Sequence, residues 1–240
     1  MSVRERKEIQ EVLWKGFGMT TAIILAAGKS ERMGGSVDKA FLSLVDKPVV
    51  AWSLMAFEKC ADIDRIVLVV RKDQIVASKA VVRMFGISKV GQIVAGGAKR
   101  QESVEAGLAA CDADTRYVVI HDGARPLVTP EVISAVVAAV KKSPAVAVGQ
   151  PVIDTLKFCE KGTSVTKTVS REKLWAVQTP QAFQLKELRA ACKALGKRTV
   201  TDDCEAVELS GGAVKIVENY KPNVKVTVPE DLQLVAKLLR

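Results

Sequence analysis

The chain has 240 residues, of which 48% are hydrophobic, so it is long enough to bury a complete core. Its formal net charge is +9, but its lysines and arginines are dispersed and aromatic residues make up only 5% of the chain. Nucleic-acid-binding proteins usually gather basic and stacking aromatic side chains on one face, so we expect a small polyanion and no nucleic acid as ligand. No apolar run is long enough to span a bilayer. Five widely spaced cysteines without a CxxC pair indicate free thiols in a reducing cytoplasm.

Residues 1–19 form a charged leader or N-terminal extension to which we assign no role, and residues 20–240 are expected to form one domain. In that domain, short β-branched runs alternate with segments of helical period. The predicted strands are residues 22–25, 65–70, 92–95, 117–121 and 145–149, and the predicted helices are residues 48–60, 73–85, 99–111 and 129–142. Apolar strands alternating with amphipathic helices predict an α/β fold, a Rossmann-like, mostly parallel twisted sheet with helices on both faces.

This alternation breaks after residue 150, where the segments VIDTLKF and SVTKTVSR are joined by Glu160-Lys161-Gly162-Thr163. The pattern predicts a β-hairpin. Because the hairpin has few large apolar residues, it would be marginal alone, and we expect a protruding arm at about residues 151–175 that contacts another subunit. Beyond the arm we predict helices at residues 184–195 and 202–209, strands at residues 214–217 and 224–227, and a terminal helix from Pro229.

The stretch LAAGKSERMGGSVDKAF, residues 25–41, has the composition of a phosphate-binding loop. The small residues Ala26, Ala27 and Gly28 let the backbone approach a ligand closely, and cations follow them. Neither familiar template fits, because the glycine spacing of a P-loop is absent and Ser30 occupies the second glycine position of a dinucleotide fingerprint. The residues alone therefore indicate an anion without identifying it.

Three further clusters are expected at the carboxyl edge of the sheet. The first is GGAKRQES, residues 96–103, where free backbone amides and a hydroxyl could meet a base or phosphate at a helix start; the others are HDGARP, residues 121–126, and NVK, residues 223–225. Each has a simpler interpretation. The two glycines could form an ordinary turn, and His121 could be a structural residue whose hydrogen bonds are satisfied. Asp122 and Arg125 could form a structural ion pair, and the side chain of Lys225 could be exposed to solvent.

Taken in order along the chain, these motifs resemble a known family. The motifs are, in order, LAAGKSERM with Lys39, GGAKRQESV, HDGARP, Asp154-Thr155, residues 169–171 followed by TPQAF, TDDCEAVE and NVKVTVPEDL. This series is similar to the motifs of the 2-C-methyl-D-erythritol 4-phosphate cytidylyltransferases of the non-mevalonate isoprenoid pathway. The resemblance runs from about Thr21 to the C-terminus. It departs at Asp38-Lys39-Ala40, where the family commonly has Pro-Lys-Gln, and at Pro222, where a polar residue is frequent.

The resemblance implies transfer of the cytidylyl group of CTP to a sugar-alcohol phosphate, with release of pyrophosphate. It assigns transition-state stabilisation at the α-phosphorus to Arg32 and Lys39, and binding of the acceptor phosphate to Arg171 and Lys225. It places the nucleotide against Ala26, Ala27, Gly28, Lys29, Gly97, Ala98, Ser103 and Asp122. It lines the acceptor site with Asp122, Arg125, Thr155, Thr179 and Thr201. It also implies a homodimer in which the arm crosses to a twofold partner and the active site is shared.

This chemistry agrees with the side chains available. A phosphomonoester has its second pKa near ~6, so it is already an anionic nucleophile at neutral pH and needs no general base. Positioning and cationic stabilisation are then the main requirements. Mg²⁺ is expected to arrive with the triphosphate, which leaves it one or two carboxylate ligands, and Asp122 is the candidate.

Two other functions stay open on the sequence alone. A related cytidylyltransferase that acts on ribitol 5-phosphate shares most of the motifs, and assays with each acceptor separate the two enzymes. The chain could also be an inactive nucleotide-binding regulatory module. Cations at both the triphosphate and the acceptor positions argue against a module, because binding alone does not require both sets.

Overall fold

The computed structural model describes residues 18–28, 39–196 and 198–239 of the chain. Its centre is a seven-stranded sheet in the order β11-β7-β10-β6-β1-β4-β5. The strands are β1 (Met19–Ala26), β4 (Arg65–Val70), β5 (Val90–Ala95), β6 (Thr115–Asp122), β7 (Ala145–Pro151), β10 (Trp175–Gln184) and β11 (Val214–Glu218). Neighbouring strands are parallel, except that β10 is antiparallel to both β6 and β7.

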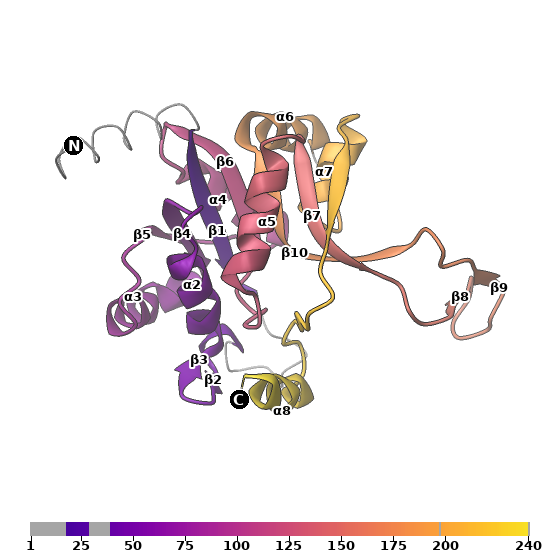
Figure 1. Ribbon diagram of the computed structural model, residues 1–240, viewed down its shortest axis with the longest axis horizontal. Helices are drawn as coiled ribbons and strands as arrows, with labels where there is room; N and C mark the ends of the chain where they lie inside the picture. Colours follow the sequence, from indigo (N-terminus) through magenta and orange to yellow (C-terminus); the bar gives the residue numbers. More distant parts are fainter. Residues whose placement is uncertain (1–17, 29–38, 197, 240) are drawn as a thin grey trace, which may run out of the picture.

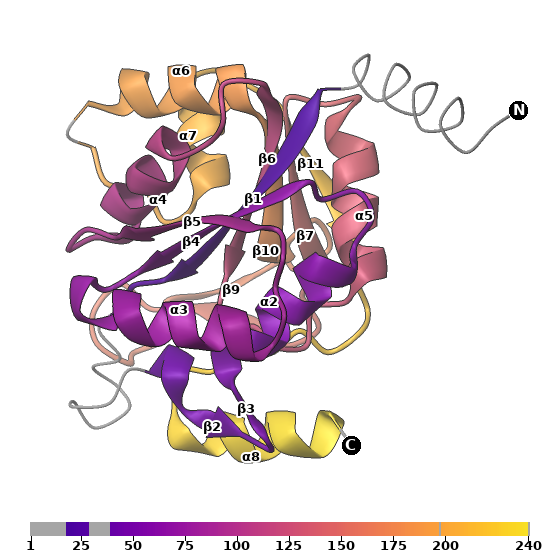
Figure 2. The same cartoon turned by 90° about the vertical axis from the view of Figure 1, so that its left-hand side faces the viewer.

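Helices cover both faces of this sheet (Figure 2). On one face lie α2 (Val49–Lys59), α3 (Ile75–Met84) and α5 (Pro130–Val140), and on the other lie α4 (Arg100–Ala109), α6 (Leu185–Leu195) and α7 (Asp203–Leu209). Strands β1, β4, β6 and β7 bury side chains on both faces, which explains their nearly continuous apolar sequences. Within the described part of the chain, no helix has the length and apolar character needed to cross a membrane.

A smaller layer lies below the sheet, where α8 (Pro229–Leu238) packs against the short hairpin of β2 (Ser43–Leu44) and β3 (Lys47–Pro48) (Figure 2). The contact is apolar and includes Leu44, Val49, Val226 and Val235, all of which are buried. It anchors the chain on both sides of the pocket described below, because the 3₁₀ turn Lys39–Phe41 precedes β2 and the segment before α8 carries Lys225.

The predicted fold class is confirmed, and so are the five predicted strands and four predicted helices of the first 150 residues, with small shifts at their ends. The strand predicted at residues 224–227 is wrong. This segment has no regular secondary structure and pairs with no strand among the described residues, because it bonds to the loop after β6 instead: Val226 donates its amide to the Ala124 carbonyl oxygen at 2.8 Å.

Strand β10 is the strand of the central sheet that the sequence prediction missed. It lies between β6 and β7 although it contains Pro180, a residue that usually excludes a segment from the interior of a sheet. The pairing with β7 passes from Gln178 opposite Val148 directly to Gln181 opposite Ala147. Residues 179 and 180 therefore stand outside the ladder, and the proline is tolerated at this bulge.

The predicted hairpin is present as β8 (Leu156–Phe158) and β9 (Lys167–Val169), which pair antiparallel. Figure 1 shows it at the end of two long extended segments, one leaving β7 and one entering β10, well away from the body of the molecule. Most of its side chains are exposed, including Ile153, Phe158 and Val165. That this arm contacts a second subunit remains a prediction.

Candidate active site

A pocket lies where β1, β5 and β6 end, at the carboxyl edge of the parallel strands. The chain leaves β1 for β4 on one side, while β6 pairs with β1 on the other, so this is the switch point at which open α/β sheets bind ligands. Its lining residues among those described are Leu25, Ala26, Ala27, Gly28, Lys39, Ala40, Gly97, Ala98, Lys99, Arg100, Ser103, Asp122, Ala124 and Lys225. Lys29 and Arg32, both predicted site residues, lie outside the described residues.

One wall of the pocket depends on the absence of a side chain at Gly96. A Cβ atom there would lie 2.5 Å from the Cβ of Ala27 and 2.6 Å from the Oγ of Ser103. Neither neighbour can retreat easily, since Ala27 directly follows β1 and Ser103 lies on α4. Glycine at position 96 therefore lets the end of β5 approach the end of β1.

The loop after Gly96 corrects one expectation from the sequence, that its backbone amides are free. Gly97 donates its amide to the Oγ of Ser103 at 3.2 Å, and Ala98 and Lys99 donate theirs to the Oε2 of Glu102 at 2.7 and 3.3 Å. Glu102 lies in the first turn of α4 and satisfies these donors locally. The loop is thus held in shape by its own helix.

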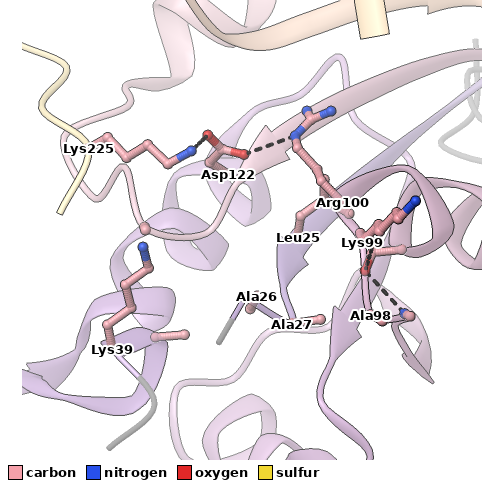
Figure 3. A pocket seen from close by; sticks show the side chains of 14 residues that line it. Leu25, Ala26, Ala27, Lys39, Ala98, Lys99, Arg100, Asp122 and Lys225 are labelled. Atoms are coloured by element: carbon pink, nitrogen blue, oxygen red, sulfur yellow. Dashed lines mark hydrogen bonds and ion pairs between the residues drawn. The ribbon is translucent and has the colours of Figure 1, made fainter. Parts of the chain in front are cut away.

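Opposite this loop, Asp122 is surrounded by cations from three segments, two of which, Arg100 and Lys225, are drawn in Figure 3. Its Oδ2 lies 2.7 Å from the Nζ of Lys225 and 3.7 Å from the Nε of Arg125, and its Oδ1 lies 3.7 Å from the Nε of Arg100. Arg125 is held in turn by the carbonyl oxygen of Asn223, to which its Nη1 donates at 2.7 Å. Figure 3 shows Lys225 and Arg100 reaching Asp122 from opposite sides and Lys39 extending into the same pocket.

The charges around Asp122 decide its ionisation. Burial alone would raise the pKa of its carboxyl, but Lys225, Arg100 and Arg125 outweigh burial and lower the pKa to about 2. Asp122 is therefore ionised at neutral pH and offsets part of the surrounding positive charge. Because several cations face one lining carboxylate in the described part of the chain, the pocket favours an anionic ligand.

His121 has a structural role, which was the simpler of the two interpretations of this residue in the sequence. It is fully buried, and burial lowers its pKa to about 4. The amide of Asp122 donates to the Oγ1 of Thr179 at 3.0 Å, so the Thr179 hydroxyl is left to donate to the Nδ1 of His121, 3.2 Å away. The His121 Nε2 can then donate to the Arg125 carbonyl oxygen at 3.2 Å. Both ring nitrogens are used, and neither is available as a general base.

The ionisation of Asp122 makes a prediction about stability. Folding lowers its pKa from 3.8 to about 2, so the carboxylate stabilises the folded chain by about 2 kcal/mol. Because the folded pKa lies below the unfolded one, this contribution is complete above about pH 5 and is lost as the pH falls towards 2. We expect the difference in unfolding free energy between the wild-type chain and Asp122→Asn to shrink over that range in urea titrations. A difference that does not vary with pH would contradict the assignment.

The comparison with protein families decides the identity of this fold and pocket. Residues 20–240 match the family model of 2-C-methyl-D-erythritol 4-phosphate cytidylyltransferase. The chain belongs to this family. It is accordingly a nucleotidyltransferase, and the family resemblance found in the sequence is confirmed.

The sequence similarity to relatives extends over almost the whole chain. The 2-C-methyl-D-erythritol 4-phosphate cytidylyltransferase of Alkaliphilus metalliredigens is 40% identical over 215 residues, which cover 88% of this chain and 89% of that protein. That of Caldanaerobacter subterraneus subsp. tengcongensis is 42% identical over 224 residues, 92% of this chain and 98% of the relative. The crystal structure of 4-diphosphocytidyl-2C-methyl-D-erythritol synthase from Anaerococcus prevotii superposes with a TM-score of 0.83 at 29% identity, covering 95% and 98% of the two chains.

For this cytidylyltransferase, the structure gathers most of the predicted site residues. Those lining the one pocket are Ala26, Ala27, Gly28, Lys39, Gly97, Ala98, Ser103, Asp122 and Lys225. Arg125 and Thr179 lie directly behind Asp122, bonded as described above. Thr201 is exposed just before α7, where its amide and hydroxyl donate to the Oε2 of Glu205 at 2.6 and 2.7 Å.

Two predicted residues lie on the arm instead, away from the pocket of their own chain. Thr155 and Arg171 are both exposed. The Nη1 of Arg171 donates to the carbonyl oxygen of Ile153 within the arm. Neither residue lines the pocket that contains Lys39, and both flank the β8–β9 hairpin, which Figure 1 shows well away from the body of the molecule.

Sequence reasoning also left out residues that the structure places in or beside the site. Arg100 lines the pocket, and Asn223 is buried with its Nδ2 donating to the Thr179 carbonyl oxygen at 2.9 Å and to the Gln178 Oε1 at 3.0 Å. Both lie within motifs that the sequence analysis had singled out. Their roles depend on contacts to segments 44 or more residues away, which no local pattern signals.

Proposed function

We propose that the chain transfers the cytidylyl group of CTP to 2-C-methyl-D-erythritol 4-phosphate, yielding 4-diphosphocytidyl-2-C-methyl-D-erythritol and pyrophosphate in non-mevalonate isoprenoid biosynthesis. The observation that carries the proposal is the meeting of Lys39 and Lys225, from opposite ends of the chain, in one pocket with the backbone of residues 26–28. Such a site can neutralise a triphosphate and a phosphomonoester together. The family to which the chain belongs carries this activity in its name.

In the proposed reaction, an oxygen of the acceptor phosphate attacks the α-phosphorus of CTP. A new P–O bond forms, the bond to the β-phosphate bridging oxygen breaks, and pyrophosphate leaves with that electron pair. The nucleophile is already anionic, which fits a site whose one histidine is buried and uncharged at neutral pH. Lys39, together with Arg32, would stabilise charge at the α-phosphorus, and Lys225 would hold the acceptor phosphate beside Asp122.

The nucleotide is proposed to lie against Ala26, Ala27, Gly28, Lys29, Gly97, Ala98 and Ser103. The wall at residues 96–98 is held rigid by Ser103 and Glu102, so its shape does not need to form upon binding. A rigid wall that leaves little space for the base favours a pyrimidine over a purine, because the purine is larger. Asp122, Arg125, Thr155, Thr179 and Thr201 are proposed to surround the acceptor.

Mg²⁺ is proposed as the cofactor, held mainly by the phosphates. Asp122 is the one carboxylate among the described lining residues, and its low pKa keeps it ionised. The Nε of Arg100 is 3.7 Å from its Oδ1, beyond hydrogen-bond distance, so that oxygen fits a metal ligand. Bound Mg²⁺ would neutralise charge on the phosphates of the leaving group.

We further propose a homodimer in which the arm of each subunit completes the site of its partner. The exposed apolar side chains of the arm and the position of Thr155 and Arg171 outside their own pocket support this arrangement. Arg171 would then bind the acceptor phosphate together with Lys225 of the other chain. A cytoplasmic location is proposed from the five cysteines, all of which are free thiols.

The deciding experiment measures pyrophosphate release by the purified chain with CTP, Mg²⁺ and a panel of sugar-alcohol phosphates. We expect turnover with 2-C-methyl-D-erythritol 4-phosphate and little with ribitol 5-phosphate. Preference for ribitol 5-phosphate would favour the alternative enzyme. That alternative is considered because Ala40 lines the pocket at a position where the family commonly has glutamine. CTP binding without turnover of any acceptor would indicate the inactive module instead.

A further inference from the structure

A second buried carboxylate lies behind the pocket, at Asp203, the first residue of α7. Its Oδ2 accepts from the Nη2 of Arg100 at 2.7 Å, a contact between residues 103 positions apart. The Asp203 side chain is 6% exposed and does not line the pocket, whereas that of Arg100 is 31% exposed and does. Arg100 thus connects a carboxylate outside the pocket to Asp122 inside it.

The shape of the Arg100 guanidinium lets Asp203 control where Arg100 lies relative to Asp122. Because the group is planar and rigid, binding its Nη2 to Asp203 also fixes the position of its Nε. That Nε lies 3.7 Å from the Oδ1 of Asp122, close enough for electrostatic attraction but too far for a hydrogen bond. Lys225 meanwhile forms the short 2.7 Å contact with the Oδ2 of Asp122. Asp203 therefore holds Arg100 back from a closer approach to Asp122.

We propose that Asp203 is a positioning residue of this site, which acts through Arg100 to keep Asp122 available to Lys225. The proposal rests on the proposed function, since it assigns Asp203 to the acceptor half of the same reaction. Without Asp203, Arg100 is released and can form two parallel hydrogen bonds to Asp122, the arrangement that arginine and carboxylate prefer. Lys225 then loses its partner and its position.

A purely structural role would explain less of what is observed. The N-terminus of α7 is capped by Asp202, whose Oδ1 accepts from the Glu205 amide at 2.9 Å and whose Oδ2 accepts from the Nε2 of Gln181 at 2.7 Å. Helix capping therefore does not require Asp203. Burial also raises the pKa of Asp203 in spite of the nearby Arg100, and buried ion pairs often contribute no more stability than apolar residues of similar size.

The test compares Asp203→Asn with Glu208→Gln, which makes the same chemical change at an exposed position of the same helix. For Asp203→Asn, we expect kcat/KM for the acceptor to fall roughly 10- to 100-fold, the range known for removing the outer partners of metal ligands, with little change in CTP affinity measured without Mg²⁺. Glu208→Gln is expected to match the wild-type chain, and Asp203→Glu to recover part of the loss. An unchanged kcat/KM in Asp203→Asn, or an equal loss of CTP affinity, overturns the proposal.

A double variant separates action through Arg100 from a general effect of position 203. In an Arg100→Gln background, Asp203→Asn should cause no further loss of kcat/KM, because the residue through which it acts is already gone. A loss as large as in the wild-type background overturns the proposal. If Asp203→Asn does not fold, Arg100→Lys provides the same information, since lysine can reach one carboxylate but cannot span both.

A crystal structure of Asp203→Asn gives a readout that needs no turnover. We expect Arg100 to move towards Asp122 and the distance between Lys225 Nζ and Asp122 Oδ2 to exceed the present 2.7 Å. An unchanged distance overturns the proposal whatever the substrate proves to be. Failure of the wild-type chain to use any acceptor, in contrast, would refute the proposed function.

Discussion

Replacing Lys39 by alanine is expected to lower turnover by roughly 10²- to 10³-fold, the scale for losing one preorganised contact to a transition state. Lys39 begins the 3₁₀ turn beside the pocket and lines the same space as Asp122 and Lys225. In the proposed reaction, its charge matters most when the α-phosphorus carries both the attacking and the leaving oxygen. CTP already meets the backbone wall before that moment, so its affinity should fall much less than kcat.

The measurement is steady-state turnover together with CTP binding by calorimetry. Lys59→Ala is a suitable control because it removes the same charge from an exposed lysine at the end of α2, away from the pocket. It should leave both quantities near those of the wild-type chain. If Lys39→Ala kept the wild-type kcat, or lost CTP affinity and kcat by the same factor, Lys39 would have no special role in the transition state.

The parts of the fold that the sequence predicted are those with local causes. Strands β1, β4 and β6 are buried on both faces, so their apolar sequences are continuous and easily found. Helix α5 begins at Pro130 after an extended Thr129, as the pattern of its first turn indicated. The pocket was predictable for the same reason, because its motifs follow strands that end at one edge of the sheet.

The parts that were missed have causes elsewhere in the chain. A proline such as Pro180 is unusual inside a sheet, and the bulge opposite β7 is what accommodates it in β10. Residues 224–227 alternate like a strand but bond to the loop after β6. The amides of residues 97–99 were expected to be free because two glycines precede a helix start, whereas Ser103 and Glu102 accept hydrogen bonds from them. The pairing of Arg100 with Asp203 depends on how α4 and α7 meet, which periodicity does not reveal.

The arm makes the second large prediction. Thr155 and Arg171 belong to the acceptor site by resemblance, yet in one chain they stand on the exposed arm. If the arm completes the partner's pocket, a working site takes Lys39 from one subunit and Arg171 from the other. Lys39→Ala and Arg171→Ala should each be nearly inactive as pure dimers, because every site then lacks one of the two cations.

Mixing the two inactive variants should restore activity. In a dimer formed from one chain of each kind, one site lacks both cations, but the other takes Lys39 and Arg171 from the two unaltered positions. With random exchange, half of the dimers are mixed and each has one intact site, so activity should reach roughly a quarter of the wild-type value. Exchange is followed by co-purification of a tagged chain.

The matched control is a mixture of Lys39→Ala with Lys225→Ala. These two lysines line the same pocket of one chain, so a mixed dimer contains no site with both, and no activity should return. Recovery in the first mixture but not in the second would place the arm in the partner's site. If subunits exchange and the first mixture stays inactive, each site is built within a single chain, and Arg171 must reach Lys225 by a rearrangement of its own arm.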